Sequence, residues 1–401
     1  MFPESRDTTP KAGLIDETLS TTRSIVATGK RILRSALGTF LYHTGLLTPL
    51  VRRANSLTVD RKTRSPKLRK SAGSKFGILC YHRVGNGGVP YHSELDPSVF
   101  EAQIRYLQQH HRIVSLCQLA EEMRSSANVP PTVAITFDDG YRDLYKYAFP
   151  VLRRYDAPAT VYLIGESVET GAAPWYDRIF AAVVAFPQRR LTIHLEHTEK
   201  FALTSHLNRL AAAWQIVCYL RSIPDVQRKA WCREFEAVLP VPESDLQDRM
   251  LTWDQVREMQ TLGMSFGAHT MSHPSVAQLS AQELKTELLD SKVSLEAGLR
   301  CEVEHFAFPF GKPSDRSATS EEYLRQCGFQ TAVTTTEGFN TARTNPFRLH
   351  RLQIGGAQPM STFALALARM FYEESPTEDF RSEKNLRRPS MDEPVPARSP
   401  F

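Results

Sequence analysis

Two neighbouring acids, Asp138 and Asp139, stand at the end of the apolar run TVAITF, and a glycine follows them at once. Adjacent carboxylates repel one another, so such a pair is best tolerated where a cation neutralises it. The two acids can then divide two tasks. One binds a metal ion, and the other takes a proton from the water that the ion activates.

Further metal ligands are present in the stretch GAHTMSHPS, where His269 and His273 are four residues apart. On a helical turn this spacing puts both imidazoles on one face, where they can hold one cation. One carboxylate completes a His₂-carboxylate set, which suits a catalytic Zn²⁺ or another divalent transition metal such as Co, Ni or Mn. An isolated HxxxH pair is more often a surface feature and Asp-Asp-Gly alone more often a turn, so the prediction depends on both motifs together.

The elements that position these residues are predicted from eight short apolar runs. Most of these runs are followed by a segment with helical periodicity. The runs are residues 76–82, 112–116, 132–137, 159–165, 264–269, 305–310, 331–336 and 351–356. Apolar runs that alternate with helices indicate a parallel sheet covered on both faces, and this number of units predicts an α/β barrel-like fold. Chemistry gathers at the carboxyl ends of such strands, which is where the candidate residues stand: His82, Asp138, Asp139, His269 and Phe310.

Residues 174–250 interrupt this alternation with mostly helical text, which predicts an α-rich insertion between the fourth and fifth runs. The insertion either walls one side of a substrate groove or serves as scaffold, and the scaffold role is favoured slightly. Trp175 and Tyr176 are the residues of the insertion expected to face a ligand.

The two ends of the chain differ from its middle. The net charge is +5, yet residues 1–70 hold 14 Lys and Arg against 5 Asp and Glu, so the positive charge is concentrated there. Within residues 23–51, apolar positions at helical spacing beside basic ones predict an amphipathic helix. This helix either contacts an anionic membrane surface or packs on the main domain. The predicted organisation is a basic extension over residues 1–74, a catalytic domain over 75–372 and a disordered tail over 373–401.

Composition and cysteine spacing indicate the class of protein and its cellular compartment. The chain is 41% hydrophobic and 23% charged, as is ordinary for a globular protein. Its six cysteines form no CxxC pair, which argues against a disulfide framework and against a cysteine-based zinc site; we expect mostly buried thiols in a reducing compartment. The chain has no apolar stretch of membrane-spanning length and no secretory layout at its start. These features favour the cytoplasm, or the inner face of its membrane.

Three motifs in this order, TFDDG, HTMSHP and FAFPFG, resemble those of the polysaccharide deacetylase family, the NodB-related carbohydrate esterase family 4. The similarity covers roughly residues 75–360. It includes the opening stretch ILCYHRV, which resembles the branch that contains poly-N-acetylglucosamine deacetylases. The resemblance implies a distorted (β/α) barrel and a divalent metal. It also implies removal of N-acetyl groups from N-acetylglucosamine-containing glycans, such as chitooligosaccharides or exopolysaccharides.

The resemblance also implies roles for individual residues. Asp138 matches the catalytic base, and Asp139 matches the metal ligand that joins His269 and His273. Phe310 lies in the loop that is usually Pro-Tyr-Gly in the family, where its backbone N–H would help to stabilise the oxyanion.

Two family positions differ in this chain. Ala307 stands where an arginine commonly tethers the catalytic aspartate; Arg351 or Arg142 could replace it, and we favour Arg351. The general acid is expected at His82, in a YH pair after the first strand, rather than at His350. An ionised base and a protonated His82 would together give a bell-shaped pH–rate profile.

Other functions are compatible with parts of the pattern. The protein could be a metal hydrolase that cleaves a non-sugar amide or an O-acetyl ester, or a catalytically inactive glycan-binding homologue. A nucleic-acid binder is the weakest alternative, because the basic residues lie in a linker with almost no aromatic residues among them.

Overall fold

The structure is a computed structural model of the 401-residue chain, and it describes residues 74–86, 94–239, 241–242, 246–247, 249–356 and 358–372. The amphipathic helix predicted within residues 23–51 and the tail predicted over 373–401 lie outside the described residues. The chain divides into two compact units, Met1–Arg64 with Gln358–Tyr372 and Ser65–Ala357 with Glu373–Phe401. The described part of the first unit contains α13 (Met360–Tyr372), and everything below concerns the second unit.

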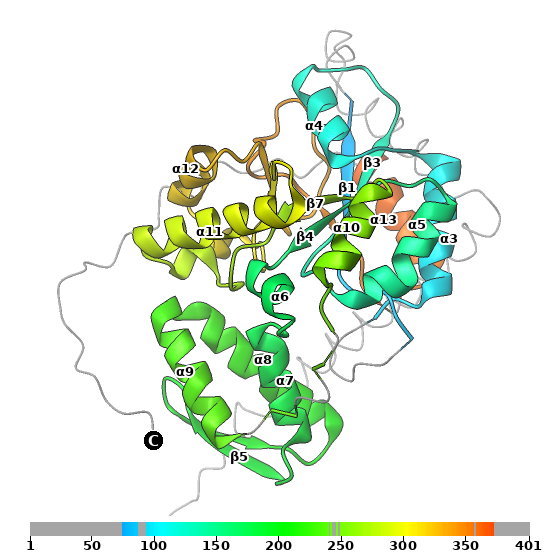
Figure 1. Ribbon diagram of the computed structural model, residues 1–401. Coiled ribbons are helices and arrows are strands. Elements are labelled where there is room, and N and C mark those ends of the chain that lie inside the picture. Colours follow the sequence, from blue (N-terminus) through cyan, green and yellow to red (C-terminus); the bar gives the residue numbers. More distant parts are fainter. Residues whose placement is uncertain are drawn as a thin grey trace, which may run out of the picture. The chain divides into compact units, whose positions relative to one another are not determined.

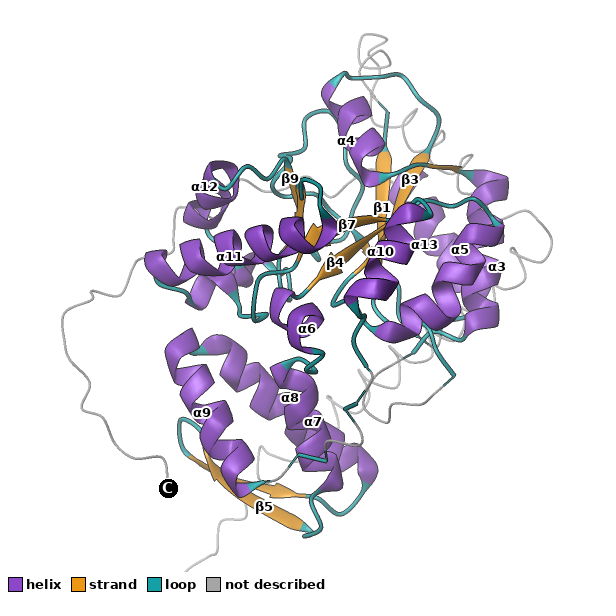
Figure 2. Ribbon diagram, viewed as in Figure 1, coloured by secondary structure: helices purple, strands orange, loops and turns teal. Residues whose placement is uncertain are grey.

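Eight strands form one sheet whose paired strands all run parallel (Figures 1 and 2). The strands are β1 (Phe76–Tyr81), β2 (Arg112–Ile113), β3 (Thr132–Phe137), β4 (Ala159–Leu163), β7 (Ser265–Ala268), β8 (His305–Ala307), β9 (Thr331–Val333) and β10 (Leu352–Gln353). Their order is β10-β1-β3-β4-β7-β8-β9, with β2 beside β3. All eight predicted apolar runs are therefore strands.

The sheet curls toward closure. Beyond the last strand of the order, Val333 of β9 forms a parallel bridge with Leu349, just before β10 returns to pair with β1. The result is a distorted (β/α) barrel, which confirms the predicted fold class. Strands β1, β3 and β4 are buried at every position, as continuous apolar runs require.

Helices cover the sheet. They are α3 (Pro97–His110), α4 (Leu116–Arg124), α5 (Phe149–Arg154) after the π-helical turn η2 (Leu144–Ala148), α6 (Gly165–Thr170), α10 (Trp253–Thr261), α11 (Ala281–Leu299) and α12 (Ala318–Gln326), with the 3₁₀ turns η4 (Val276–Gln278) and η5 (Pro313–Asp315). The longest of them, α11, begins at a capping box in which Ser280 and Glu283 satisfy each other's backbone amides.

The insertion forms a small assembly of its own, drawn in green in Figure 1. It contains α7 (Trp175–Ala185), β5 (Arg190–His194), β6 (Thr198–Ala202), α8 (His206–Ser222) and α9 (Asp225–Val238), packed round a separate apolar core. The antiparallel hairpin β5–β6 was not predicted. Its signal is short, since only Leu191 and Ile193 alternate inward among exposed polar residues.

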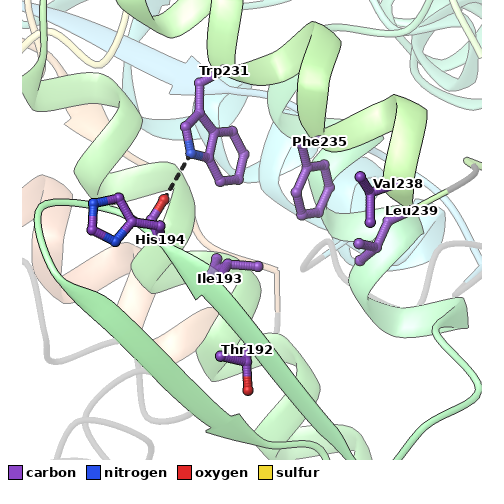
Figure 3. Close-up of a pocket in the computed structure, with 7 residues that line it drawn as sticks. All are labelled: Thr192, Ile193, His194, Trp231, Phe235, Val238 and Leu239. Atoms are coloured by element: carbon purple, nitrogen blue, oxygen red, sulfur yellow. Dashed lines mark hydrogen bonds between the residues drawn. The ribbon is translucent and has the colours of Figure 1, made fainter. Parts of the chain in front are cut away.

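The hairpin packs against α9 around a cavity of about 30 Å³ (Figure 3). Trp231 closes it by donating its indole N–H to the carbonyl of His194 at 3.1 Å. A cavity of this size has room for a water molecule or two, whereas sites for small organic ligands measure roughly 300–1,000 Å³. The insertion's own cavity is therefore too small for a sugar.

The cysteines correct one expectation. All six have free thiols, but only Cys80 and Cys232 are buried, while Cys117, Cys218 and Cys301 are exposed. The prediction of mostly buried thiols was wrong, because three of the six cysteines are exposed and Cys327 is partly exposed.

None of the helices among the described residues combines the length and hydropathy needed to cross a bilayer.

Candidate active site

The predicted site residues gather at one edge of the sheet. His82 follows β1, Asp138 and Asp139 follow β3, and His269 follows β7. These strands are close in the sheet order, and because they are parallel their carboxyl ends meet at the same edge. The fold thus brings residues from three distant parts of the sequence to one place.

The Asp-Asp-Gly turn sends its two carboxylates to different partners. Asp139 has a left-handed backbone with φ 72°, and Gly140 follows with φ 77°. The turn is closed by the Gly140 N–H, which donates to the Asp138 carbonyl at 2.9 Å. Aspartate tolerates this backbone region better than most residues, but a held left-handed residue still marks a functional position. A Cβ at Gly140 would lie 2.7 Å from the side chain of Leu163, so the turn requires glycine.

Asp139 and the two histidines form a buried cluster with the spacing of metal ligands. The Nε2 atoms of His269 and His273 each lie 3.5 Å from Asp139 Oδ1. Nδ1 of His269 donates to the Ala307 carbonyl at 2.7 Å, which leaves the Nε2 lone pair directed at the cluster. Ligands of one tetrahedral zinc ion are separated by roughly 3.3 Å. The three residues therefore fit a divalent metal ion.

The loop that carries the histidines is not helical, and the predicted helical turn was wrong. Thr270 and His273 both have positive φ, of 63° and 56°. The loop is held by side chains: the His273 N–H donates to Thr270 Oγ1 at 3.0 Å, and Glu287 of α11 accepts the backbone N–H groups of Met271 and Ser272, each at 2.9 Å. Sequence reasoning missed Glu287, whose only signal is an acid among the apolar positions of α11.

Neighbouring charges separate the pKa values of the two histidines, which are both buried. Burial lowers the pKa of His269, but the hydrogen bond to Asp139 and the negative charges of Asp138 and Asp139 together outweigh it and leave that pKa raised. For His273, burial and repulsion by His269 lower the pKa to about 3. Burial would raise the pKa of Asp139, yet the imidazoles beside it hold that pKa below its usual range. An ionised Asp139 and a neutral His273 are the forms that bind a metal.

Asp138 is held by Arg351, which is fully buried. The guanidinium donates from Nη1 to Oδ1 and from Nη2 to Oδ2, both at 2.7 Å, while its Nε donates to the Thr334 carbonyl at 2.8 Å. Burial acts to raise the pKa of Asp138, but Arg351 lowers it to about 2. Arg351, and not Arg142, thus makes the contact to Asp138 that family members commonly make from the position occupied here by Ala307. With both oxygens of Asp138 engaged, Asp139 is the acid free to bind a metal.

A second neighbour of Asp138 was not foreseen. Cys80, the penultimate residue of β1, lies with Sγ 3.5 Å from Asp138 Oδ2. Burial raises the pKa of this thiol well above its ordinary value, so the thiol stays protonated and donates to the carboxylate. The contact follows from the pairing of β1 with β3, which no sequence signal indicated.

His82 and His350 are placed differently. His82 Nε2 lies 3.9 Å from Asp138 Oδ2, and its side chain is 43% exposed. His350 is fixed through its backbone, since its N–H donates to Asn340 Oδ1 at 2.8 Å and its carbonyl accepts from Asn340 Nδ2 at 2.9 Å. The geometry favours His82 as the histidine beside the base.

The Phe310 loop and the insertion meet at His273. Phe310 has φ 59°, and within the described residues its amide donates to no other group, so the N–H is available to a substrate oxygen. Its ring lies 4.9 Å from that of His273. Trp175 of α7 donates its indole N–H to the His273 carbonyl at 3.0 Å, and the ring of Tyr176 lies 4.8 Å from the His273 ring. Trp175 is partly buried and Tyr176 is buried, so both support the histidine from behind.

Comparisons with known proteins agree with this geometry. A family model described as polysaccharide deacetylase matches residues 126–332. The protein YxkH of Bacillus subtilis (strain 168), whose name places it among polysaccharide deacetylases, is 22% identical over 299 residues, which cover 74% of this chain and 77% of that protein. The poly-β-1,6-N-acetyl-D-glucosamine N-deacetylase of Escherichia coli (strain K12) is 34% identical over 100 residues, but these cover only 24% of this chain and 15% of that enzyme.

Among solved structures, the Streptococcus pyogenes deacetylase PplD in complex with acetate superposes with a TM-score of 0.51. The match covers 75% of this chain and 99% of that protein, at 21% identity. It supports the fold and says nothing of the substrate.

Proposed function

The chain belongs to the polysaccharide deacetylase family, and on that premise we propose that it hydrolyses N-acetyl groups from N-acetylglucosamine units of an oligo- or polysaccharide. The observation that supports this most directly is the pairing of two acids with separate partners. Asp138 is ionised and held by Arg351, while Asp139 faces His269 and His273. A metal hydrolase needs both a ligand set and a base that stays off the metal.

The proposed metal is Zn²⁺, or another divalent transition ion, held by Asp139, His269 and His273. When bound, such an ion acts as a Lewis acid and lowers the pKa of bound water toward ~7.

The chain's own residues supply the remaining steps. Asp138 accepts the proton of the attacking water, and the Arg351 fork keeps its carboxylate ionised and oriented. The Phe310 N–H donates to the oxygen that becomes negatively charged when the carbonyl is attacked. His82, when protonated, gives its proton to the leaving nitrogen as the C–N bond breaks. The products are acetate and a free amine on the sugar.

The glycan substrate is supported by the relatives. The matching Escherichia coli enzyme is named for poly-β-1,6-N-acetylglucosamine, although the match spans only 15% of its length. The side chain of His82 is 43% exposed, so the proposed proton donor is accessible from solvent.

The first test is acetate release from β-1,6- and β-1,4-linked N-acetylglucosamine oligomers by the metal-loaded protein. Asp138→Asn is expected to lower the rate by roughly 10²–10⁴-fold, because it removes the general base, while the bound metal is retained. Asp139→Asn should lose the metal of the catalytic site together with activity. Asp254→Asn, which changes a fully exposed acid on α10, is the matched control and should behave as wild type.

If metal binds but neither oligomer is deacetylated, the N-acetylglucosamine proposal fails. The same preparations assayed on O-acetyl esters and non-sugar acetamides would then show whether another acyl substrate replaces it.

A further inference from the structure

A large cavity lies at the end of the barrel opposite the candidate active site. Its volume is about 680 Å³, and its lining includes Cys117, Arg124, Glu304, His305, Arg325 and Phe347. His305 is the first residue of β8, so the cavity opens at the amino ends of the strands. The catalytic cluster uses the other end of the same strand, since the carbonyl of Ala307 accepts from His269.

Three residues of this lining bring metal-ligand atoms together. One ligand atom each from Cys117, Glu304 and His305 can be chosen so that all lie within 4.8 Å of one another. Zinc ligands that include a thiolate lie roughly 3.5 Å apart, so a closing movement of about 1 Å is required. Cys117 is exposed in the first turn of α4, where rotation about its own χ1 can supply that movement.

His305 is oriented as metal-binding histidines are. Its side chain is 6% exposed, and its Nδ1 lies 2.9 Å from Thr331 Oγ1 on the neighbouring strand β9. A partner on one ring nitrogen fixes the ring and leaves the other, Nε2, as the ligand.

We propose that Cys117, Glu304 and His305 bind a second divalent transition-metal ion, separate from the catalytic one. A thiolate, a carboxylate and an imidazole favour Zn²⁺ or Co²⁺ over Mg²⁺ and Ca²⁺, which prefer oxygen ligands only. The two anionic ligands balance the charge of the ion. Arg124 also lines this cavity.

This site would join α4, which supplies no residue of the catalytic cluster, to the amino end of β8. Cys117 belongs to α4, whereas Glu304 and His305 lie at the start of β8. A bound ion would therefore connect a covering helix to the sheet directly, and its occupancy does not depend on the deacetylase proposal.

Cobalt distinguishes the two sites, because only a site with a cysteine ligand gives a thiolate-to-cobalt charge-transfer band in the near ultraviolet. The full-length protein is stripped with chelator and reloaded with Co²⁺. Wild type is expected to bind two ions per chain and to show the band. Asp139→Asn should bind one ion and keep the band, while Cys117→Ser should bind one and lose it. Cys301→Ser, another exposed cysteine, is the matched control and should change neither quantity.

A wild-type protein that binds one ion without the band would overturn the proposal, as would a band that persists in Cys117→Ser. If Cys117→Ser does not fold, Glu304→Gln provides the same test through the half-buried carboxylate. Acetate release is measured on the same samples, so failure of this site and failure of the proposed function remain distinguishable.

Discussion

At the scale of residues, the Asp138–Arg351 pair dominates the candidate active site. Both side chains are buried, and the bidentate contact satisfies both carboxylate oxygens. Breaking such a pair from one side leaves a buried charge without compensation, which costs more than the pair itself contributes. The pair is therefore sensitive to substitution of either member.

Replacing Arg351 by Met is expected to destabilise the fold by about 3–5 kcal/mol, because Asp138 is left charged and unpaired. Combining Arg351→Met with Asp138→Asn should recover much of that loss, since no buried charge remains. Arg351→Lys keeps the charge but not the two-pronged contact, so we expect intermediate stability and reduced kcat. Urea unfolding of wild type, Arg351→Met, Asp138→Asn and the double variant measures the coupling. Equal destabilisation of the single and double variants would contradict it.

At the scale of elements, the sequence predicted the strands, because a strand depends on the local pattern of apolar residues. The apolar runs that became β1, β3 and β4 are buried on both faces, which explains why they show no polar alternation. The loop after β7 could not be predicted in the same way. Glu287, on a later helix, accepts from the two residues between the loop's positive-φ positions, and sequence spacing carries no information on such a contact. The Asp138–Cys80 contact and the proximity of Cys117 to His305 likewise depend on which strands and helices become neighbours.

Glu287→Gln tests whether α11 holds the histidine loop in its binding form. Glutamine has the same size as glutamate but lacks the negative charge of the carboxylate. The carboxylate accepts from the backbone N–H groups of Met271 and Ser272, and without the charge these hydrogen bonds are weaker. We expect metal affinity at the catalytic site to fall roughly 10–100-fold, as for other partners of metal ligands, with the fold retained. Chelator competition measures it. Asp290→Asn, an exposed acid on the same helix, should leave affinity unchanged, and an unchanged affinity in Glu287→Gln would rule out the role.

At the scale of the whole molecule, the parallel sheet separates two chemistries along its strands. The acid–histidine cluster lies at the carboxyl ends, and the cavity with Cys117 lies at the amino ends. The family motifs allowed the first to be predicted from sequence. The absence of a CxxC pair argued against cysteine-based zinc sites, but that reasoning considered only cysteines close together in the sequence.

Metal binding to the native state should raise the stability of the whole barrel. At a free metal concentration 100 times Kd, one site contributes about 2.7 kcal/mol, equivalent to a rise in Tm of roughly 5 °C. We expect chelation to lower the Tm of wild type, and Asp139→Asn to remove the part of this shift that belongs to the catalytic site. Differential scanning calorimetry with and without chelator measures both. If chelation lowers the Tm of Asp139→Asn by as much as that of wild type, the stabilising metal is not bound by Asp139.

The contact between Asp138 and Arg351 spans 213 residues of sequence. A nascent chain therefore exposes its base long before the counter-charge has been synthesised. Until the segment around β10 docks beside β1, Asp138 can be buried only in its protonated form, or the sheet must stay open to water at that point. The barrel consequently acquires the buried ion pair that holds the proposed base only when β10, the last strand among the described residues, is added.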